Sequence, residues 1–143
     1  MRDELFAAIA GRGATLNGSP LHVSACTALE EALVGTVFPM RDSPKLPGYL
    51  AVFNRVLPRC RGVRRAGACA LDLCFVAAGR LDGFFVLGAK SWDVAAGALL
   101  VEEAGGRIGD LAGGGDFLRT NELIAASPGV FAALRDAVAA SRI

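Results

Sequence analysis

The sequence predicts an α/β fold in which a mostly or partly parallel sheet is flanked by helices. Short apolar runs typical of buried strands alternate along the chain with segments of helical periodicity. Hydrophobic residues make up 53% of the 143 residues and 18 more are glycine, which exceeds the apolar content of an ordinary domain. We therefore expect strands buried on both faces, or a surface that meets a partner. A chain of this length is expected to form a single domain over residues 1–143.

The first 24 residues are predicted to form a hairpin. Two apolar stretches, residues 5–10 and 16–24, are accompanied by Gly11-Arg12-Gly13 and Asn17-Gly18, which favour tight turns with positive φ. The only histidine, His22, falls in the alternating second stretch, where we expect a surface or structural role. This part of the chain is thus predicted as short strands joined by turns.

Strands and helices alternate over the remaining residues. Apolar runs predict strands at residues 34–38, 62–66, 81–87, 107–108 and 123–126. A helical turn at residues 28–32 is followed by predicted helices at residues 49–57, 68–78 and 93–104, and by a last one from Pro128. Gly79 and Gly105 suit the ends of two of these helices, and Ser127-Pro128 suits the start of the last. The run at residues 113–115 predicts a turn and not a phosphate loop, because no Gly-Lys-Ser/Thr follows it.

The helix that follows Lys90-Ser91-Trp92 is the segment around which the rest of the chain is organised. Asp93 stands at its N-cap or in its first turn, where a carboxylate meets free N–H groups and the positive end of the helix dipole. The small residues 95–98 allow another backbone to approach closely, while Glu102 and Glu103 suit a solvent-facing position. The simplest interpretation is a buried helix that Asp93 merely caps.

The start and the end of this helix carry two motifs, Trp92-Asp93 with Ala95-Ala96-Gly97 and then Glu103-Ala104-Gly105-Gly106. Together they resemble the C-terminal signature of the inositol monophosphatase family, whose members are Mg²⁺-dependent phosphomonoesterases. Other segments match in order and approximate spacing, at residues 11–14, 16–18, 64–67 and 77–85. The resemblance covers nearly the whole chain but only the second half of a family member. It implies the C-terminal half of a layered α-β-α-β-α fold, with a hairpin at residues 1–24 that belongs to the sheet of the first half.

The resemblance implies hydrolysis of a small phosphate monoester, with Mg²⁺ as cofactor and Asp93 as one metal ligand. Mg²⁺ takes six oxygen ligands, so a single carboxylate contributes to a site without completing it. The other ligands of the family, a glutamate and the two aspartates of Asp-Pro-Ile/Leu-Asp-Gly-Thr, have no counterpart here, and we expect Asp72 and Asp82 to be structural. No catalytic residue is assigned, and the chain alone is expected to be inactive. The alternative function is a catalytically inactive structural or dimerisation module.

The resemblance also implies a substrate site formed by Gly67, Ala68, Cys69 and Val86. A helix that begins after Gly67 leaves the backbone N–H groups of Ala68 and Cys69 pointing out of its N-terminus. The family has a hydroxyl residue where this chain has Ala68, and typically a glutamate that binds ring hydroxyls where it has Val86. Both departures weaken the case for inositol as the substrate, although Val86 also suits the core of a buried strand.

Composition favours no other class of function. A net charge of +1 without a concentrated basic tract gives no electrostatic case for nucleic acid. No apolar run reaches the roughly 18 residues of a membrane span, and the first residues are too acidic for a signal peptide. No C-x-x-C pair occurs, so reduced cytoplasmic thiols are expected for Cys26, Cys60, Cys69 and Cys74. The family is commonly dimeric, and a homodimer is expected of the intact family member.

Overall fold

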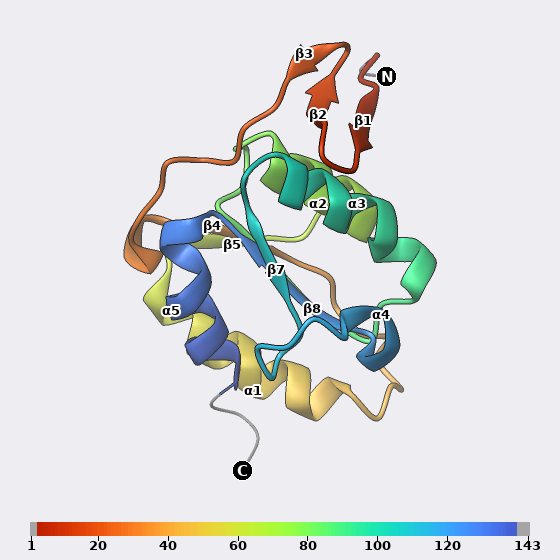
Figure 1. Cartoon of the computed structure of the whole chain (residues 1–143). Helices are drawn as coiled ribbons and strands as arrows, with labels where there is room; N and C mark the ends of the chain where they lie inside the picture. Colours follow the sequence, from red (N-terminus) through yellow and green to blue (C-terminus); the bar gives the residue numbers. More distant parts are fainter. Residues whose placement is uncertain (1–2, 140–143) are drawn as a thin grey trace.

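A five-stranded mixed sheet forms the centre of the molecule, which is described here for residues 3–139 of a computed structural model (Figure 1). The strand order is β5-β4-β6-β8-β7, with β4 parallel to both β5 and β6 and with β8 antiparallel to both β6 and β7. The bounds are β4 Leu33–Thr36, β5 Gly62–Arg64, β6 Gly83–Leu87, β7 Arg107–Gly109 and β8 Glu122–Ala126. The predicted α/β class and the partly parallel sheet are therefore confirmed.

Helices cover both faces of this sheet. One face packs against α2 (Cys69–Ala77) and α3 (Ser91–Glu103), and the other against α1 (Leu46–Val56) and α5 (Pro128–Ala139) (Figure 1). Alternate residues of β6 point to opposite layers, since Phe84 packs on the α2 and α3 side and Phe85 on the α1 and α5 side. The apolar excess of the sequence thus corresponds to strands that are buried on both faces.

A separate three-stranded sheet stands beside α3. It consists of β1 (Phe6–Ile9), β2 (Gly13–Leu16) and β3 (Ser19–Pro20), all antiparallel in the order β1-β2-β3. Asn17 adopts a φ of 50° in the turn between β2 and β3, as the Asn-Gly signal predicts. The Glu103 carboxylate at the end of α3 accepts hydrogen bonds from the backbone N–H groups of Gly11 and Gly13, each at 2.7 Å. Glu103 is therefore partly exposed while its carboxylate is bound to the backbone of this turn, and Glu102 is exposed, as expected.

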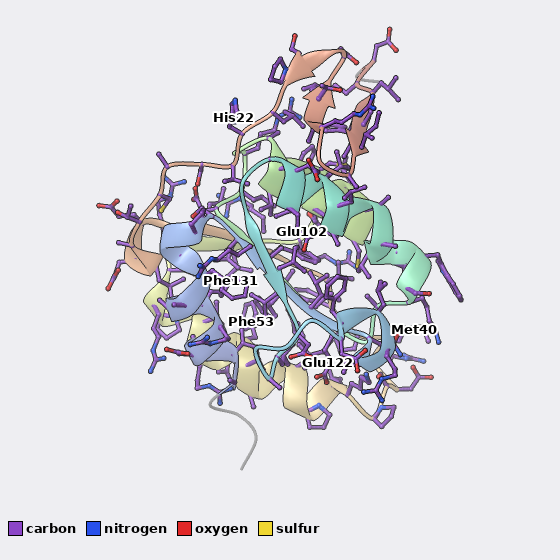
Figure 2. The ribbon with its side chains drawn as sticks, in the orientation of Figure 1. His22, Met40, Phe53, Glu102, Glu122 and Phe131 are labelled. Atoms are coloured by element: carbon purple, nitrogen blue, oxygen red, sulfur yellow. The ribbon has the colours of Figure 1, made fainter. Side chains whose placement is uncertain are left out.

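Several sequence-based boundaries differ from the structure. Helix α1 begins at Leu46 and not at residue 49, because Pro47 fits the first turn of a helix, where no N–H partner is needed. A short helix, α4 (Phe117–Thr120), was not predicted, and the turn at residues 28–32 is a 3₁₀ helix over Leu29–Glu31. His22 lies in no strand, since β3 ends at Pro20, and its side chain is exposed (Figure 2). None of the helices in the described part of the chain is long and apolar enough to cross a membrane.

Candidate active site

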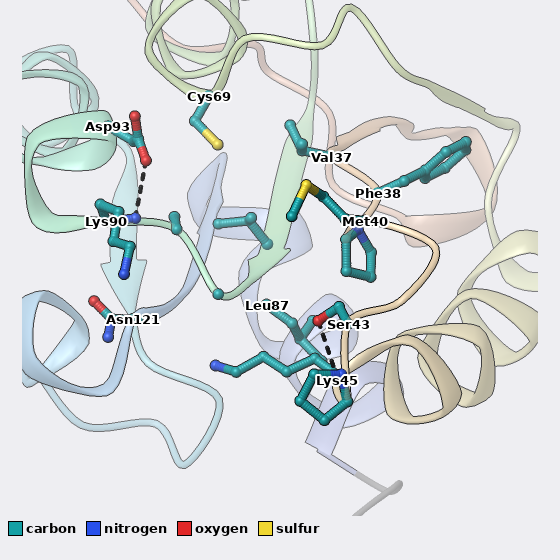
Figure 3. Close-up of a pocket in the computed structure, with 15 residues that line it drawn as sticks. Val37, Phe38, Met40, Ser43, Lys45, Cys69, Leu87, Lys90, Asp93 and Asn121 are labelled. Atoms are coloured by element: carbon teal, nitrogen blue, oxygen red, sulfur yellow. Dashed lines mark hydrogen bonds between the residues drawn. The ribbon is translucent and has the colours of Figure 1, made fainter.

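A cavity of about 440 Å³ opens where the parallel strands β4 and β6 end. Its lining comes from the segment after β4, from the turn after β6, and from the first turns of α2 and α3 (Figure 3). Ligand sites of α/β sheets commonly lie at the carboxyl ends of the strands. The lining residues are Val37, Phe38, Pro39, Met40, Ser43, Pro44, Lys45, Cys69, Val86, Leu87, Gly88, Ala89, Lys90, Asp93 and Asn121.

Asp93 is the only acidic residue of this lining. It lies in the first turn of α3, and its Oδ2 accepts a hydrogen bond of 2.9 Å from the backbone N–H of Lys90. The side chain is half-buried, and no described residue donates a hydrogen bond to Oδ1. Asp93 therefore does stabilise the start of the helix, as the simplest interpretation holds, and it also presents an oxygen to the cavity.

The start of α2 brings Cys69 to the same cavity. Its thiol points toward the lining, and burial, followed by the nearby carboxylates of Asp93 and Asp72, raises the pKa of Cys69 to about 11 (Figure 3). A thiol with this pKa is protonated at neutral pH and is a poor nucleophile. Gly67, with a φ of 91°, and Ala68, the N-cap of α2, are both exposed and lie outside the lining.

Val86 belongs to the core and to the cavity at once. It is only 3% exposed and packs with the residues between the sheet and α2 and α3, yet it also lines the cavity that Asp93 borders. The structure thus brings Val86, Cys69 and Asp93 to one place and leaves Gly67 and Ala68 outside it.

Lys45, Lys90 and Asn121 complete the polar part of the lining, and sequence reasoning missed all three as site residues. Lys45 is the N-cap of α1 and Lys90 the N-cap of α3, while Asn121 ends α4 with a φ of 60°. For Asn121, the only signal in the local sequence was that Asn tolerates left-handed backbone. The three residues are far apart in sequence, so only the fold shows that they share a cavity.

Asp72 is a buried carboxyl group in α2. The residue is 1% exposed, and neither carboxyl oxygen has a hydrogen bond with a described residue. Burial raises the pKa of Asp72 to about 6, against the opposing effect of Arg65. Asp82, in contrast, accepts a 2.7 Å hydrogen bond from the Leu33 N–H and has a structural role.

The residues around Asp93 offer few oxygen ligands for a divalent cation. Mg²⁺ prefers carboxylate and water oxygens in octahedral geometry, and the free oxygen of Asp93 suits one such position. Across residues 3–139, no group of three or more His, Cys, Asp or Glu side chains is placed to hold a metal ion. Among the lining residues, Asp93 alone could offer a carboxylate oxygen to such an ion, and a complete site would need further ligands.

Comparison with known proteins gives consistent results. The sequence model described as "Inositol monophosphatase family" matches residues 1–142. The Nus factor SuhB of Pseudomonas aeruginosa is 48% identical over 136 residues, which are 94% of this chain and 50% of that protein. The putative Nus factor SuhB of Neisseria meningitidis is 42% identical over 97% of this chain and 53% of its own length. The chain thus spans about half the length of these curated relatives.

Solved structures agree with the sequence matches. The extragenic suppressor protein suhB of Bartonella henselae superposes with a TM-score of 0.91 at 41% identity, over 95% of this chain and 53% of that one. The inositol monophosphatase of Anabaena superposes with a TM-score of 0.89 at 38% identity, over 95% of this chain and 54% of that one.

Proposed function

Because the chain belongs to the inositol monophosphatase family, we propose that it carries part of the active site of a Mg²⁺-dependent enzyme that hydrolyses a small phosphate monoester. Membership supports a phosphatase-like enzyme class, while the cofactor and the substrate are our proposal. The observation that carries it is the place of Asp93, the only carboxylate that the described residues place on the cavity of about 440 Å³. One of its oxygens accepts a hydrogen bond from the Lys90 N–H, and the other has no donor among residues 3–139.

Asp93 would hold Mg²⁺ through its free oxygen. The metal, when bound, supplies Lewis-acid polarisation of the phosphate and lowers the pKa of a bound water. Within the chain, the Lys90 N–H fixes the orientation of the carboxylate, and the first turn of α2 closes the site on the side of Cys69. We further propose that Cys69 and Val86, which line the cavity, lie on the side of the leaving group. The family resemblance implies the same side for Gly67 and Ala68, which lie outside the lining.

The remaining metal ligands would come from the half of the family fold that this chain does not span. We propose that the chain corresponds to the C-terminal half. We also propose that the segment predicted as a hairpin over residues 1–24, in which the structure has β1, β2 and β3, pairs with the sheet of the other half. Two observations support this arrangement. In the described residues, no strand pairs with the outer edge of β1. Leu5, just before this strand, and Ile9, its last residue, are 70% and 61% exposed. We expect the intact protein to be a cytoplasmic homodimer.

The test compares this chain with a chimera in which it follows the other half of the Pseudomonas aeruginosa relative. We expect the chain alone to show no Mg²⁺-dependent turnover of p-nitrophenyl phosphate, and the chimera to hydrolyse it. The intact relative serves as the activity control, and circular dichroism checks that the chimera folds. A folded but inactive chimera beside an active relative contradicts the phosphatase proposal, while an active chain alone contradicts the missing-ligand argument.

A second candidate is a role without catalysis. The chain would then act as a structural or dimerisation module, or in the manner of the relatives that are called Nus factors. One structural observation favours it. The net charge of +1 led us to expect no nucleic-acid partner, yet four exposed arginines gather at the β5 edge of the sheet, namely Arg59, Arg61, Arg64 and Arg65. Salt-dependent binding of an RNA oligonucleotide that is lost when these arginines become glutamine would support this candidate.

A further inference from the structure

Both lysines of the chain line the cavity beside Asp93. Lysine occurs only at positions 45 and 90 among the 15 Lys and Arg residues, and both lysines line this cavity. Lys45 precedes α1 and Lys90 precedes α3, so two separate loops deliver the two ammonium groups (Figure 3). Because Asp93 is the only acid of the lining, the side chains leave the cavity with an excess of positive charge.

Neither ammonium group is neutralised by the described part of the chain. The salt bridges among described residues all involve arginine, and Asp93 binds the backbone of Lys90 and not its ammonium group. Lys45 lies over the bare backbone of Gly88, where an added Cβ would be 3.6 Å from its Nζ. The two ammonium groups and the amide of Asn121 therefore face a ligand in this cavity, where Asp93 is the one acidic residue of the described lining (Figure 3).

The rest of the wall is poorly suited to a polyol. Apart from Ser43 and Asn121, the lining side chains are charged, apolar or sulfur-containing, or are absent at Gly88. The Ser43 Oγ accepts a 3.2 Å hydrogen bond from the Lys45 N–H, which occupies one of its two lone pairs. Ring hydroxyls would thus meet few acceptors, and an unpaired buried hydroxyl weakens binding.

The geometry points to a substrate whose leaving group carries a second negative charge, a carboxylate or a further phosphate, which Lys45 and Lys90 bind. This inference rests on the proposed function, in which Asp93 and Mg²⁺ hold the phosphate that is hydrolysed. The charge-assisted hydrogen bonds of two ammonium groups to one anion are stronger than neutral ones and weaken as salt is added. A neutral alcohol phosphate lacks this contact.

The two lysines make a direct binding measurement possible. Reductive methylation with ¹³C-formaldehyde keeps their charge and gives one NMR signal for each lysine, with the α-amino group as an internal control. We titrate the chain with 2-phosphoglycolate and with ethyl phosphate, which differ in the carboxylate, in the presence of Mg²⁺. We expect both lysine signals to shift with saturation and 2-phosphoglycolate to bind about tenfold more tightly. The inference is overturned if the chemical shifts of the lysine signals do not change, or change no more than that of the α-amino signal.

Variants then separate the inference from the proposed function. In the chimera, we expect kcat/KM to be about tenfold higher for 2-phosphoglycolate than for ethyl phosphate. The double variant Lys45→Gln/Lys90→Gln should remove this preference. Arg41→Gln, on the same loop as Lys45 but outside the lining, should keep it. A chimera that hydrolyses neither ester contradicts the proposed function. The NMR titration then still tests whether the two lysines bind an anion. A chimera that hydrolyses both esters equally, before and after the lysine changes, overturns only the inference.

Discussion

Gly97 of α3 lies directly against Leu73 of α2, so closely that an added Cβ would be 2.5 Å from the Leu73 Cβ. Gly97→Ala gains about 1 kcal/mol of helix propensity but creates an overlap that typically costs about 1–3 kcal/mol. The clash is with a backbone-anchored atom that has no room to move, so we expect a net loss of stability. Urea denaturation measures it.

A double-mutant cycle is the control for this prediction. Leu73→Ala removes the atoms that a Cβ at Gly97 would meet beyond the Leu73 Cβ, which are Cγ and Cδ1. The cost of Gly97→Ala should therefore be smaller in the Leu73→Ala background. Equal costs in both backgrounds would show that the close helix contact is not what excludes alanine.

A second prediction concerns the contact between Glu103 and the hairpin. Hydrogen bonds from Gly11 and then Gly13 hold the pKa of Glu103 below its usual value, so this stabilisation is present at neutral pH and is lost as the pH falls through the lowered pKa. Glu103→Ala should make the amides of Gly11 and Gly13 exchange several-fold faster with deuterium at neutral pH. The exposed neighbour supplies the control, since Glu102→Ala should leave both amides unchanged.

Helix ends follow from the local sequence, whereas strand direction and the site depend on contacts between distant residues. Gly79, Gly105 and Pro128 mark helix ends through their own backbone preferences, and the structure has helix ends at these positions. The antiparallel direction of β8 and the absence of a strand at His22 depend on tertiary contacts, which periodicity does not contain. The site shows the same contrast. The Asp93 motif was visible in the sequence, whereas only the fold brings Lys45, Lys90 and Asn121 to the same cavity.

A third prediction concerns pH and Asp72. Burial raises the pKa of this carboxyl to about 6, so the folded chain binds a proton that the unfolded chain has already released between about pH 4 and 6. The stability that Asp72 contributes is therefore present at low pH and is lost as the pH rises through 6. A shift of this size corresponds to about 3 kcal/mol at most.

Asp72→Asn tests the titration because an amide is uncharged at every pH. We expect the variant to become more stable relative to the original chain as the pH rises from 5 to 8, measured by thermal denaturation. The fixed cost of burying an amide does not change with pH and so does not affect the slope. Parallel stability curves for the two proteins would contradict the buried, titrating carboxyl.

A fourth prediction concerns Asp93 in the chimera. Asn keeps an oxygen for the Lys90 N–H and caps helices about as well as Asp, but it removes a negative metal ligand. Turnover should fall by roughly 100-fold or more while the thermal midpoint stays or rises. Asp93→Ala is the matched variant that should lose both activity and stability. Retained activity in Asp93→Asn, together with lower stability, would leave Asp93 with a capping role alone.

The last prediction concerns Val86, which lines the cavity while being 3% exposed. Its isopropyl group accepts no hydrogen bond, so a ring hydroxyl beside it would be unpaired at a cost of about 1–3 kcal/mol. A glutamate at this position would accept from such a hydroxyl and would have Lys45 and Lys90 on the same cavity as counter-charges. Val86→Glu in the chimera should therefore raise kcat/KM for inositol 1-phosphate by about tenfold and leave that for ethyl phosphate unchanged. Val86→Gln, which accepts the hydrogen bond without a charge, should give a smaller gain and keeps the test informative if the glutamate disrupts folding. No gain in either folded variant would place Val86 in the core alone, with no part in choosing the substrate.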